Sequence, residues 1–156
     1  MPWPTRAIGE TGSGKEAVVR ALHALSPRSA APLVAVECAA IPAELAESPF
    51  FGHERGAFTG ADRRRDGLFE GVVGGTLFLD EIGELSPRVH ARLLRVQQEG
   101  TFQRVGGADP LRFSGRVMDA THRPLEDFER SGFRAALHHR LSTFVIRVPA
   151  LARYLL

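Results

Sequence analysis

The sequence predicts an α/β protein whose core is a mainly parallel, five-stranded sheet. Short apolar runs of strand length alternate along the chain with segments of helical periodicity. A glycine-rich segment separates the first apolar run from the first helical segment. A later apolar run ends abruptly in two carboxylates, Asp80 and Glu81. The 156 residues, 44% of them hydrophobic, suffice for one domain with its own core.

Five segments are expected to form the strands. The first ends near Ile8, and Pro2, Pro4 and Arg6 interrupt it, which is unusual in a buried parallel strand. The other four are residues 33–38, 76–80, 116–120 and 143–148. We therefore expect a regular sheet with a weak first strand.

Four further elements follow from local patterns. The first long helix begins at Lys15, and its expected apolar face consists of Ala17, Val18, Ala21, Leu22 and Leu25. The second has Ser86 as N-cap and Pro87 at its first position, and it ends at Gly100, with Val89, Leu93 and Val96 at helical spacing. Residues 101–105 and 111–113 flank Gly106-Gly107 and predict a hairpin, and residues 134–141 predict a short helix.

Bulk composition excludes several classes of protein. The net charge of +2 does not by itself indicate nucleic-acid binding. Cys38 is the only cysteine, which excludes an internal disulfide and favours a reducing, cytoplasmic location. The six histidines show no zinc spacing, and no apolar run approaches the ~18 residues of a membrane span. The N-terminus lacks the apolar region of a signal peptide.

The segment GETGSGKE matches the first seven positions of the phosphate-binding pattern G-x-x-x-x-G-K-[ST]. Glycines let backbone N–H groups turn toward an anion, and the following helix adds the positive end of its dipole. The expected nucleotide-binding residues are Gly9, Glu10, Thr11, Gly12, Ser13, Gly14, Lys15 and Glu16. Glu16 stands where Ser or Thr would place a hydroxyl on Mg²⁺. A plain glycine-rich turn is the alternative interpretation.

The segment GGTLFLDE supplies the second nucleotide motif. Asp80 at the strand end can hold Mg²⁺, and Glu81 can polarise an attacking water. Two carboxylates that merely keep a strand end soluble are the alternative. The phosphate-binding pattern upstream favours the first interpretation.

Five segments occur in an order and spacing typical of one bacterial family: GETGSGKE, GHERGAFTGA, GGTLFLDEIGEL, LLRVQQEGTFQRVGG and FRAALHHRL. On these segments the chain resembles, at family level, the central AAA+ domain of bacterial enhancer-binding proteins, the ATPases that activate sigma-54 RNA polymerase. The resemblance runs from about Ile8 to Pro149. It implies a P-loop NTPase fold, a three-layer αβα sandwich. It also implies ATP and Mg²⁺ as cofactors and ATP hydrolysis as the reaction.

The resemblance also implies a role for each matching residue. Lys15 and the glycines form Walker A, and Asp80 and Glu81 form Walker B. Arg134 and Arg140 match the family's arginine fingers, which act on the neighbouring subunit's site in a ring, expected to be a hexamer. Without the family match, a solvated helix face would be preferred for both arginines.

GAFTGA is close to diagnostic of the family, where it tips a loop that contacts sigma-54 and moves with nucleotide state. The expected contact residues are Gly56, Ala57, Phe58, Thr59, Gly60 and Ala61. The two glycines would permit an unusual backbone. The alternative places Phe58 in a local hydrophobic cluster. The run Arg63 to Arg65 is interpreted as solvated charge.

Several positions depart from the family pattern. Glu37 stands where the family usually has the Asn that switches the Walker B glutamate, and it would bring a carboxylate toward Glu81. His122 stands at the sensor position that usually reads Asn, where it could donate to the γ-phosphate region and make the site pH-sensitive. Relative to the family, we expect one AAA+ core over residues 1–156, truncated at both ends. The segment that builds the adenine pocket, the helical lid, the receiver and the DNA-binding domain are expected to be absent.

The function predicted from sequence is an ATP-driven module that remodels the sigma-54 polymerase holoenzyme. The first alternative is a hydrolysis-deficient remnant that keeps only a sigma-54-binding surface, an interpretation that Glu37 and His122 favour. A small-molecule kinase is the second alternative, but nothing in the sequence supplies an acceptor site.

Overall fold

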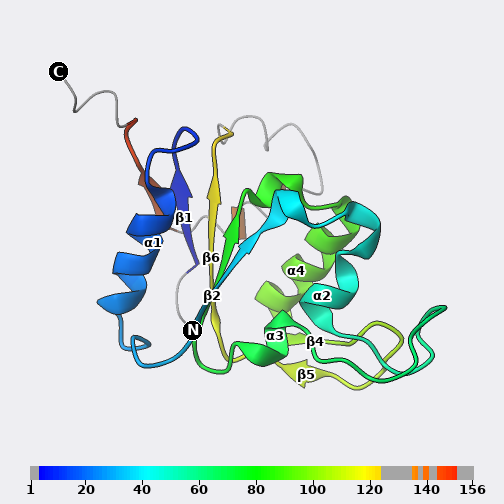
Figure 1. Ribbon diagram of the computed structural model, residues 1–156. Coiled ribbons are helices and arrows are strands. Elements are labelled where there is room, and N and C mark those ends of the chain that lie inside the picture. The colour runs from blue at the N-terminus through cyan, green and yellow to red at the C-terminus, as the bar shows by residue number, and fades with distance from the viewer. Residues whose placement is uncertain (1–3, 124–134, 137–138, 141–143, 151–156) are drawn as a thin grey trace.

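Strands and helices alternate along the chain (Figure 1). The computed structural model describes residues 4–123, 135–136, 139–140 and 144–150. In chain order the elements are β1 (Thr5–Ile8), α1 (Lys15–Ala24), β2 (Leu33–Glu37), the 3-10 turns η1 (Cys38–Ala40) and η2 (Ala43–Leu45), α2 (Glu47–Phe51), α3 (Leu68–Gly71), β3 (Thr76–Asp80), the 3-10 turn η3 (Ile82–Glu84), α4 (Pro87–Glu99), β4 (Thr101–Phe102), β5 (Leu111–Arg112), β6 (Arg116–Thr121) and β7 (Phe144–Arg147).

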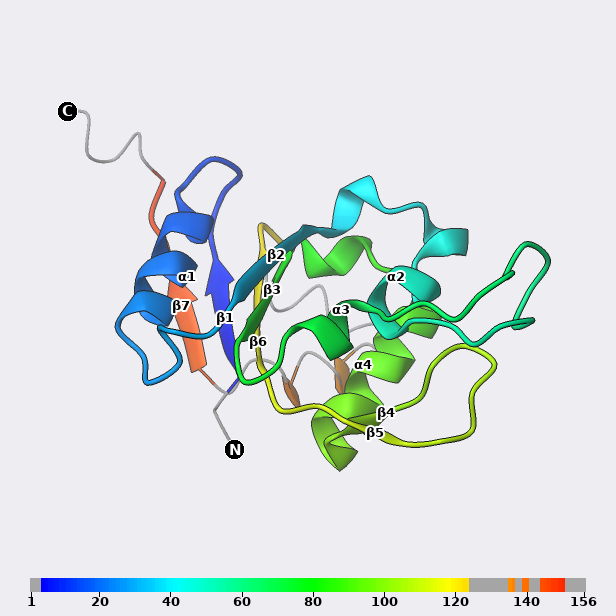
Figure 2. The ribbon, with the colours of Figure 1, turned by 60° about the horizontal axis from the view of Figure 1, so that its bottom comes forward.

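Within the described residues, the main sheet has five parallel strands in the order β2-β3-β6-β1-β7. Helix α1 covers one face, and α2 and α4 cover the other, so the elements form three layers (Figures 1 and 2). The predicted strands agree with the observed ones to within one residue at each described end. The α/β three-layer fold is thus confirmed.

Strand β3 is buried along most of its length and contributes side chains to both cores. Its side chains alternate between the two faces of the sheet. Leu77 and Leu79 join the larger cluster, which also contains Val89 and Leu93 of α4. Phe78 joins the smaller cluster beneath α1. Both faces of the sheet are therefore apolar, which explains the continuous apolar sequence of this strand.

Helix α4 has the limits that the sequence predicts. The Ser86 hydroxyl accepts a hydrogen bond from the Val89 N–H at 3.3 Å, and Pro87 fills the first turn. Gly100 adopts φ 71°, and its N–H donates to the Val96 carbonyl. Both ends are set by local chemistry.

The predicted apolar face of α1 is wrong by part of a turn. The buried residues are Lys15, Val19 and His23, whereas Leu25 is 87% exposed. Ala17 and Ala21 are also exposed, and only Val18 and Leu22 of the predicted face are half-buried. His23 is buried because its ring hydrogen-bonds to the Thr76 hydroxyl on β3 and to the Ala31 carbonyl. A satisfied polar side chain thus replaces an apolar one in this helix–sheet contact.

The expectation that Arg6 interrupts the first strand is also wrong. Strand β1 is buried throughout and lies between β6 and β7. Arg6 is paired in register with Asp119 of β6, and its Nε and Nη2 donate to the two carboxylate oxygens at 2.5 and 3.2 Å. Burial raises the pKa of Asp119, and the Arg6 guanidinium opposes that shift. A buried ion pair therefore stands where the sequence suggests a break.

The hairpin is shorter than predicted. Thr101 and Phe102 pair with Arg112 and Leu111, but the pairing stops there. Val105 instead donates to the Gly52 carbonyl at 2.9 Å and accepts from the Glu54 N–H at 3.0 Å. The loop after β4 consequently lies along the loop after α2, and both extend from the same end of the molecule (Figure 2).

The predicted short helix at 134–141 lies largely outside the described residues, although its residues 135, 136, 139 and 140 are helical. Among the residues that the structure describes, no helix combines the length and apolarity needed to traverse a bilayer.

The buried ion pair generates a test of what holds β1 against β6. Arg6→Met leaves the Asp119 carboxylate buried without its cation, so we expect it to lower the free energy of unfolding by about 3–5 kcal/mol. The double change Arg6→Met with Asp119→Val removes both charges and is expected to restore most of this loss. Urea unfolding followed by circular dichroism measures both effects. A double variant as unstable as the single one would contradict this account.

Candidate functional site

The phosphate loop, residues 9–16, connects β1 to α1 and has the backbone expected of an anion cradle. Gly12 and Gly14 have φ angles of 79° and 92°, which L side chains rarely adopt. A Cβ added at Gly9 would lie 2.5 Å from the Val148 carbonyl oxygen, so the chain requires glycine there. The loop leads directly into the N-terminus of α1, whose first N–H groups have no side-chain cap.

Lys15 points back into this loop rather than into solvent. The residue is 6% exposed, and its Nζ donates to the carbonyls of Gly9 and Glu10 at 2.8 and 2.9 Å. The ammonium is thus held beside the N–H groups of the cradle. Glu10, Thr11 and Glu16 are exposed, whereas Ser13 is buried.

Glu16 stands where Ser or Thr would place a hydroxyl on Mg²⁺, but its side chain is bound to a neighbouring residue of α1. Its carboxylate accepts from Arg20 at 2.8 Å, one helical turn further along α1.

Three carboxylates lie near the phosphate loop at the ends of two neighbouring strands. Glu37 ends β2 and is paired in register with Asp80, which ends β3. Burial raises the pKa of Asp80, and the negative charges of Glu37 and Glu81 raise it further, while Lys15 opposes the shift. Glu81 is, among the described residues, the one non-glycine with a positive φ, 56°. The site therefore concentrates negative charge and backbone strain at one edge of the sheet.

Glu37 lies beside Asp80, and its side chain hydrogen-bonds to the backbone of the turn that follows β2. Its Oε1 accepts from the Ala39 N–H at 3.3 Å and caps the turn η1. The residue paired with Glu37 across the two strands is Asp80, and the predicted approach of this carboxylate to Glu81 stays a prediction. Its switch role stays a prediction.

These residues line one cavity of about 350 Å³. Its walls are formed by Thr11, Gly12, Gly14, Lys15, Glu16, Glu37, Asp80 and Glu81. No group of three or more His, Cys, Asp or Glu suited to a metal occurs among the described residues. One carboxylate beside a phosphate cradle fits Mg²⁺, which commonly keeps its waters and takes further ligands from phosphate. The sequence analysis thus identified residues that the fold brings together.

His122 follows β6 and contacts Glu81. Its Nδ1 lies 2.7 Å from Glu81 Oε2, and its backbone N–H donates to the same oxygen at 3.4 Å. The predicted contact of His122 with a γ-phosphate stays a prediction, and the observed partner is Glu81.

The two arginines expected to act in a neighbouring site are described unequally. Arg140 is exposed, and its Nη2 lies 3.4 Å from the Gln97 carbonyl at the end of α4. Arg134 lies outside the described residues. Arg140 therefore reaches the surface of this chain, as a group that acts on another chain must.

The tip loop, residues 56–61, extends away from the cavity. Gly56 and Gly60 have φ angles of 79° and 95°, and the Gly56 N–H donates to the Ala61 carbonyl at 2.8 Å. Phe58 is 47% exposed, and its ring packs edge-on against the buried His53 ring, with centroids 4.8 Å apart. Phe58 thus belongs to neither of the two core clusters. Thr59 and the arginines 63–65 are exposed.

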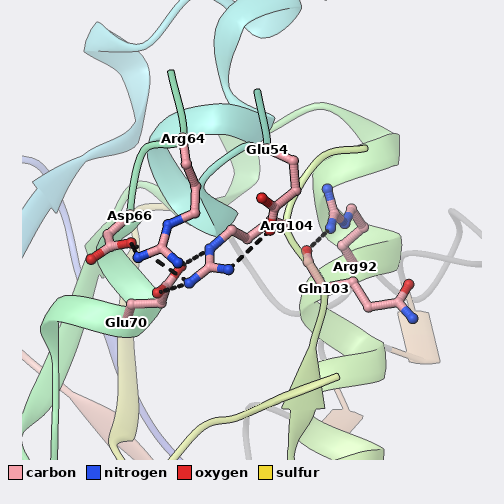
Figure 3. A network of polar contacts seen from close by, with 7 residues as sticks. All are labelled: Glu54, Arg64, Asp66, Glu70, Arg92, Gln103 and Arg104. Atoms are coloured by element: carbon pink, nitrogen blue, oxygen red, sulfur yellow. Dashed lines mark hydrogen bonds and ion pairs between the residues drawn. The ribbon is translucent and has the colours of Figure 1, made fainter. Parts of the chain in front are cut away.

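A cluster of charges holds the base of this loop, and the sequence analysis missed it. Arg104, from the loop after β4, donates to both oxygens of Glu70 at 2.8 and 2.7 Å and to Glu54 at 2.9 Å (Figure 3). Asp66 lies 3.6 Å from the same guanidinium. These contacts raise the pKa of Arg104, chiefly through the hydrogen bonds that its guanidinium donates to Glu70. The partners lie 34 and 50 residues away in sequence, so no local spacing reveals them.

Arg92 connects this Arg104 cluster to α4. Its guanidinium lies 4.1 Å above the Phe51 ring, and its Nη2 donates to the Gln103 carbonyl (Figure 3). Burial lowers the pKa of Arg92, and the nearby Glu47 carboxylate opposes the shift. Helix α4 thus contacts Gln103, the residue that precedes Arg104.

Comparison with known proteins identifies relatives over nearly the whole chain. The model of the Sigma-54 interaction domain matches residues 3–147. The Nif-specific regulatory protein of Azotobacter vinelandii is 53% identical over 145 residues, which is 92% of this chain and 28% of that protein. The NorR regulator of anaerobic nitric oxide reductase from Klebsiella pneumoniae is 56% identical over 144 residues, again 92% and 28%. The chain therefore spans about a quarter of the length of these relatives.

The chain also superposes on solved structures. The crystal structure of NtrX from Brucella abortus superposes with a TM-score of 0.87 at 36% identity, covering 96% of this chain and 34% of NtrX. NtrX in complex with ATP superposes with a TM-score of 0.86. The fold is that of the AAA+ P-loop ATPases.

The electrostatics of the cavity generate a stability test. Because the folded pKa of Asp80 is raised, ionisation of this carboxyl destabilises the fold as the pH rises through that pKa. Without nucleotide and Mg²⁺, we expect Asp80→Asn to raise the free energy of unfolding at pH 7, and the gain to shrink toward acid pH. Denaturant unfolding across pH measures this, with the exposed Asp109→Asn as control. A destabilised Asp80→Asn variant at pH 7 would contradict the prediction.

Proposed function

The chain belongs to the family of sigma-54 interaction domains, and from this premise we propose that it is the nucleotide-driven core of an activator of sigma-54-dependent transcription. It binds Mg²⁺-ATP, hydrolyses the β–γ phosphoanhydride and uses the tip loop to remodel the sigma-54 polymerase holoenzyme. The observation that carries the proposal is the single cavity lined by Lys15, Asp80 and Glu81. Cytoplasmic location and assembly into a hexameric ring are parts of the same proposal.

The cavity residues divide the chemistry among them. Lys15 and the N–H groups of the phosphate loop bind the phosphate oxygens. When bound, Mg²⁺ neutralises phosphate charge, and Asp80 is the carboxylate that fits it. Glu81 orients a water and accepts its proton as it attacks the terminal phosphorus. Arg134 and Arg140 of a neighbouring chain complete the site by stabilising charge on the transferred phosphoryl group.

A continuous series of contacts supports coupling between the cavity and the tip loop. The buried His90 of α4 donates from Nε2 to the Ile82 carbonyl at 2.9 Å, directly after Walker B. Two residues further along, Arg92 donates to the Gln103 carbonyl. Arg104 then binds Glu54 and Glu70 on either side of the tip loop. We infer that a shift of the turn η3 reaches the loop through α4.

One observation favours a second function, a chain that binds nucleotide and sigma-54 without hydrolysis. Glu81 Oε2 already accepts from two donors of His122, and Glu37 adds negative charge beside Asp80. If these contacts persist with nucleotide bound, Glu81 Oε2 stays engaged by His122 and is less able to accept a proton from water. Turnover measurements distinguish the two functions.

We expect ATP turnover per chain to rise with protein concentration, because each site is completed by a neighbour. Lys15→Ala should abolish nucleotide binding. Arg140→Ala should leave binding intact and lower turnover by about 10³-fold or more. Phosphate release and fluorescent-nucleotide binding measure these effects, with the exposed Arg112→Ala as control. Nucleotide binding without turnover at any concentration would favour the second function.

We expect Phe58→Ala to weaken sigma-54 binding by about 2 kcal/mol or more, since an exposed aromatic at a loop tip is typical of a binding hot spot. ATP turnover should stay unchanged, because Phe58 does not line the cavity. Titration of purified sigma-54 measures the affinity. Phe144→Ala, at another exposed phenylalanine, is the matched control. Equal losses in both variants would contradict a specific contact.

A further inference from the structure

The contact between His122 and Glu81 has a defined direction. A carboxylate can only accept, so the 2.7 Å contact requires a proton on His122 Nδ1. The backbone N–H of His122 donates to the same oxygen. The side chain of Glu81 is only 18% exposed, and that of His122 is 45% exposed. The imidazole ring is thus bound to Glu81 through Nδ1, while part of the His122 side chain is exposed.

A neutral imidazole carries a single N–H. While Nδ1–H donates to Glu81, Nε2 is an acceptor and cannot bind a phosphate oxygen, which also only accepts. The same N–H can serve either Glu81 or a terminal phosphate oxygen, but not both. The two roles are therefore mutually exclusive for a neutral ring.

The neighbouring contacts fix the two segments that carry this pair. The Arg123 N–H donates to the hydroxyl of Thr121, which is buried at the end of β6. Arg123 Nη2 donates to Glu84 Oε1 at 3.0 Å, and its side chain lies over Gly83. The segment after β6 is thus fastened to the turn η3 at two points, His122 on Glu81 and Arg123 on Glu84.

The Glu37 carboxylate accepts a hydrogen bond from the turn η1, whereas the observed donors to Glu81 both come from His122. We propose that His122, and not Glu37, is the residue that positions and gates the Walker B glutamate, by giving its Nδ1–H either to Glu81 or to the terminal phosphate. This inference rests on the proposed function. Transfer of the N–H to phosphate releases Glu81 Oε2 to receive a proton from water, so His122 links the presence of the terminal phosphate to activation of the base.

Histidine ¹⁵N NMR of the whole chain tests the contact without requiring turnover. The spectra are recorded at about pH 8.5, well above the ordinary histidine pKa of about 6.5. His23 and His90 face carbonyl oxygens with Nε2 and serve as internal references protonated there. We expect His122, assigned with His122→Asn, to be protonated on Nδ1. Glu81→Ala should remove the protected Nδ1–H signal, and Glu37→Ala should retain it.

Nucleotides test the exchange of partners. Mg²⁺ with a non-hydrolysable ATP analogue should shift the Nδ1–H signal, and Mg²⁺-ADP should not. In turnover, His122→Ala should lower kcat about tenfold or more with KM within about twofold. His122→Asn, which keeps an N–H donor, should recover most of kcat. Arg123→Met, which loosens the segment but keeps the donor, should affect kcat less than His122→Ala.

The outcomes separate this inference from the proposed function. Failure to bind any nucleotide overturns the proposed function, while the NMR of the unliganded chain still tests the His122–Glu81 contact. Nucleotide binding and turnover with His122 protonated on Nε2, or with a signal insensitive to Glu81→Ala, overturns the inference alone. Loss of the His122 Nδ1–H signal in Glu37→Ala would overturn the inference and assign the gating role to Glu37.

Discussion

The parallel register of the sheet is the constraint on which the site depends. Because all five strands of the main sheet run the same way, the segments after them leave from one edge. The phosphate loop follows β1, the carboxylates end β2 and β3, and His122 follows β6. Residues as far apart in sequence as Thr11 and Glu81 thus line one cavity, as expected at the carboxyl edge of an open α/β sheet, and His122 contacts Glu81 beside it.

Charged side chains are neutralised by a partner inside the sheet, whereas negative charge is in excess at its edge. Inside the sheet, Arg6 and Asp119 neutralise each other with matched geometry. At the edge, Asp80 lies between two further carboxylates, with Lys15 as the opposing cation, and its raised pKa reflects this imbalance. The first arrangement holds strands together, and the second prepares a site that gains stability when cations bind.

Helix α4 contacts both the turn beside the cavity and the segment that holds the base of the tip loop. Its buried face packs in the larger core through Val89, Leu93, Leu94 and Val96. His90 binds the turn behind Walker B, and Arg92 binds the backbone beside the Arg104 cluster. The tip loop projects from the fold, but its base is fastened by charges from both flanking segments (Figure 3).

The sequence by itself determined the features that local chemistry sets: the apolar strands, the capped helix after Ser86, the glycine cradle with Lys15 and the carboxylates after β3. The tertiary structure alone decided the partners of polar side chains, since hydrogen bonds between residues distant in sequence leave no periodic signal. It turned Arg6 from an interruption into half of an ion pair with Asp119, and it turned the buried face of α1 toward His23. It also assigned Glu81 to His122 and assembled the Arg104 cluster, because these contacts exist only once the strands and loops lie side by side.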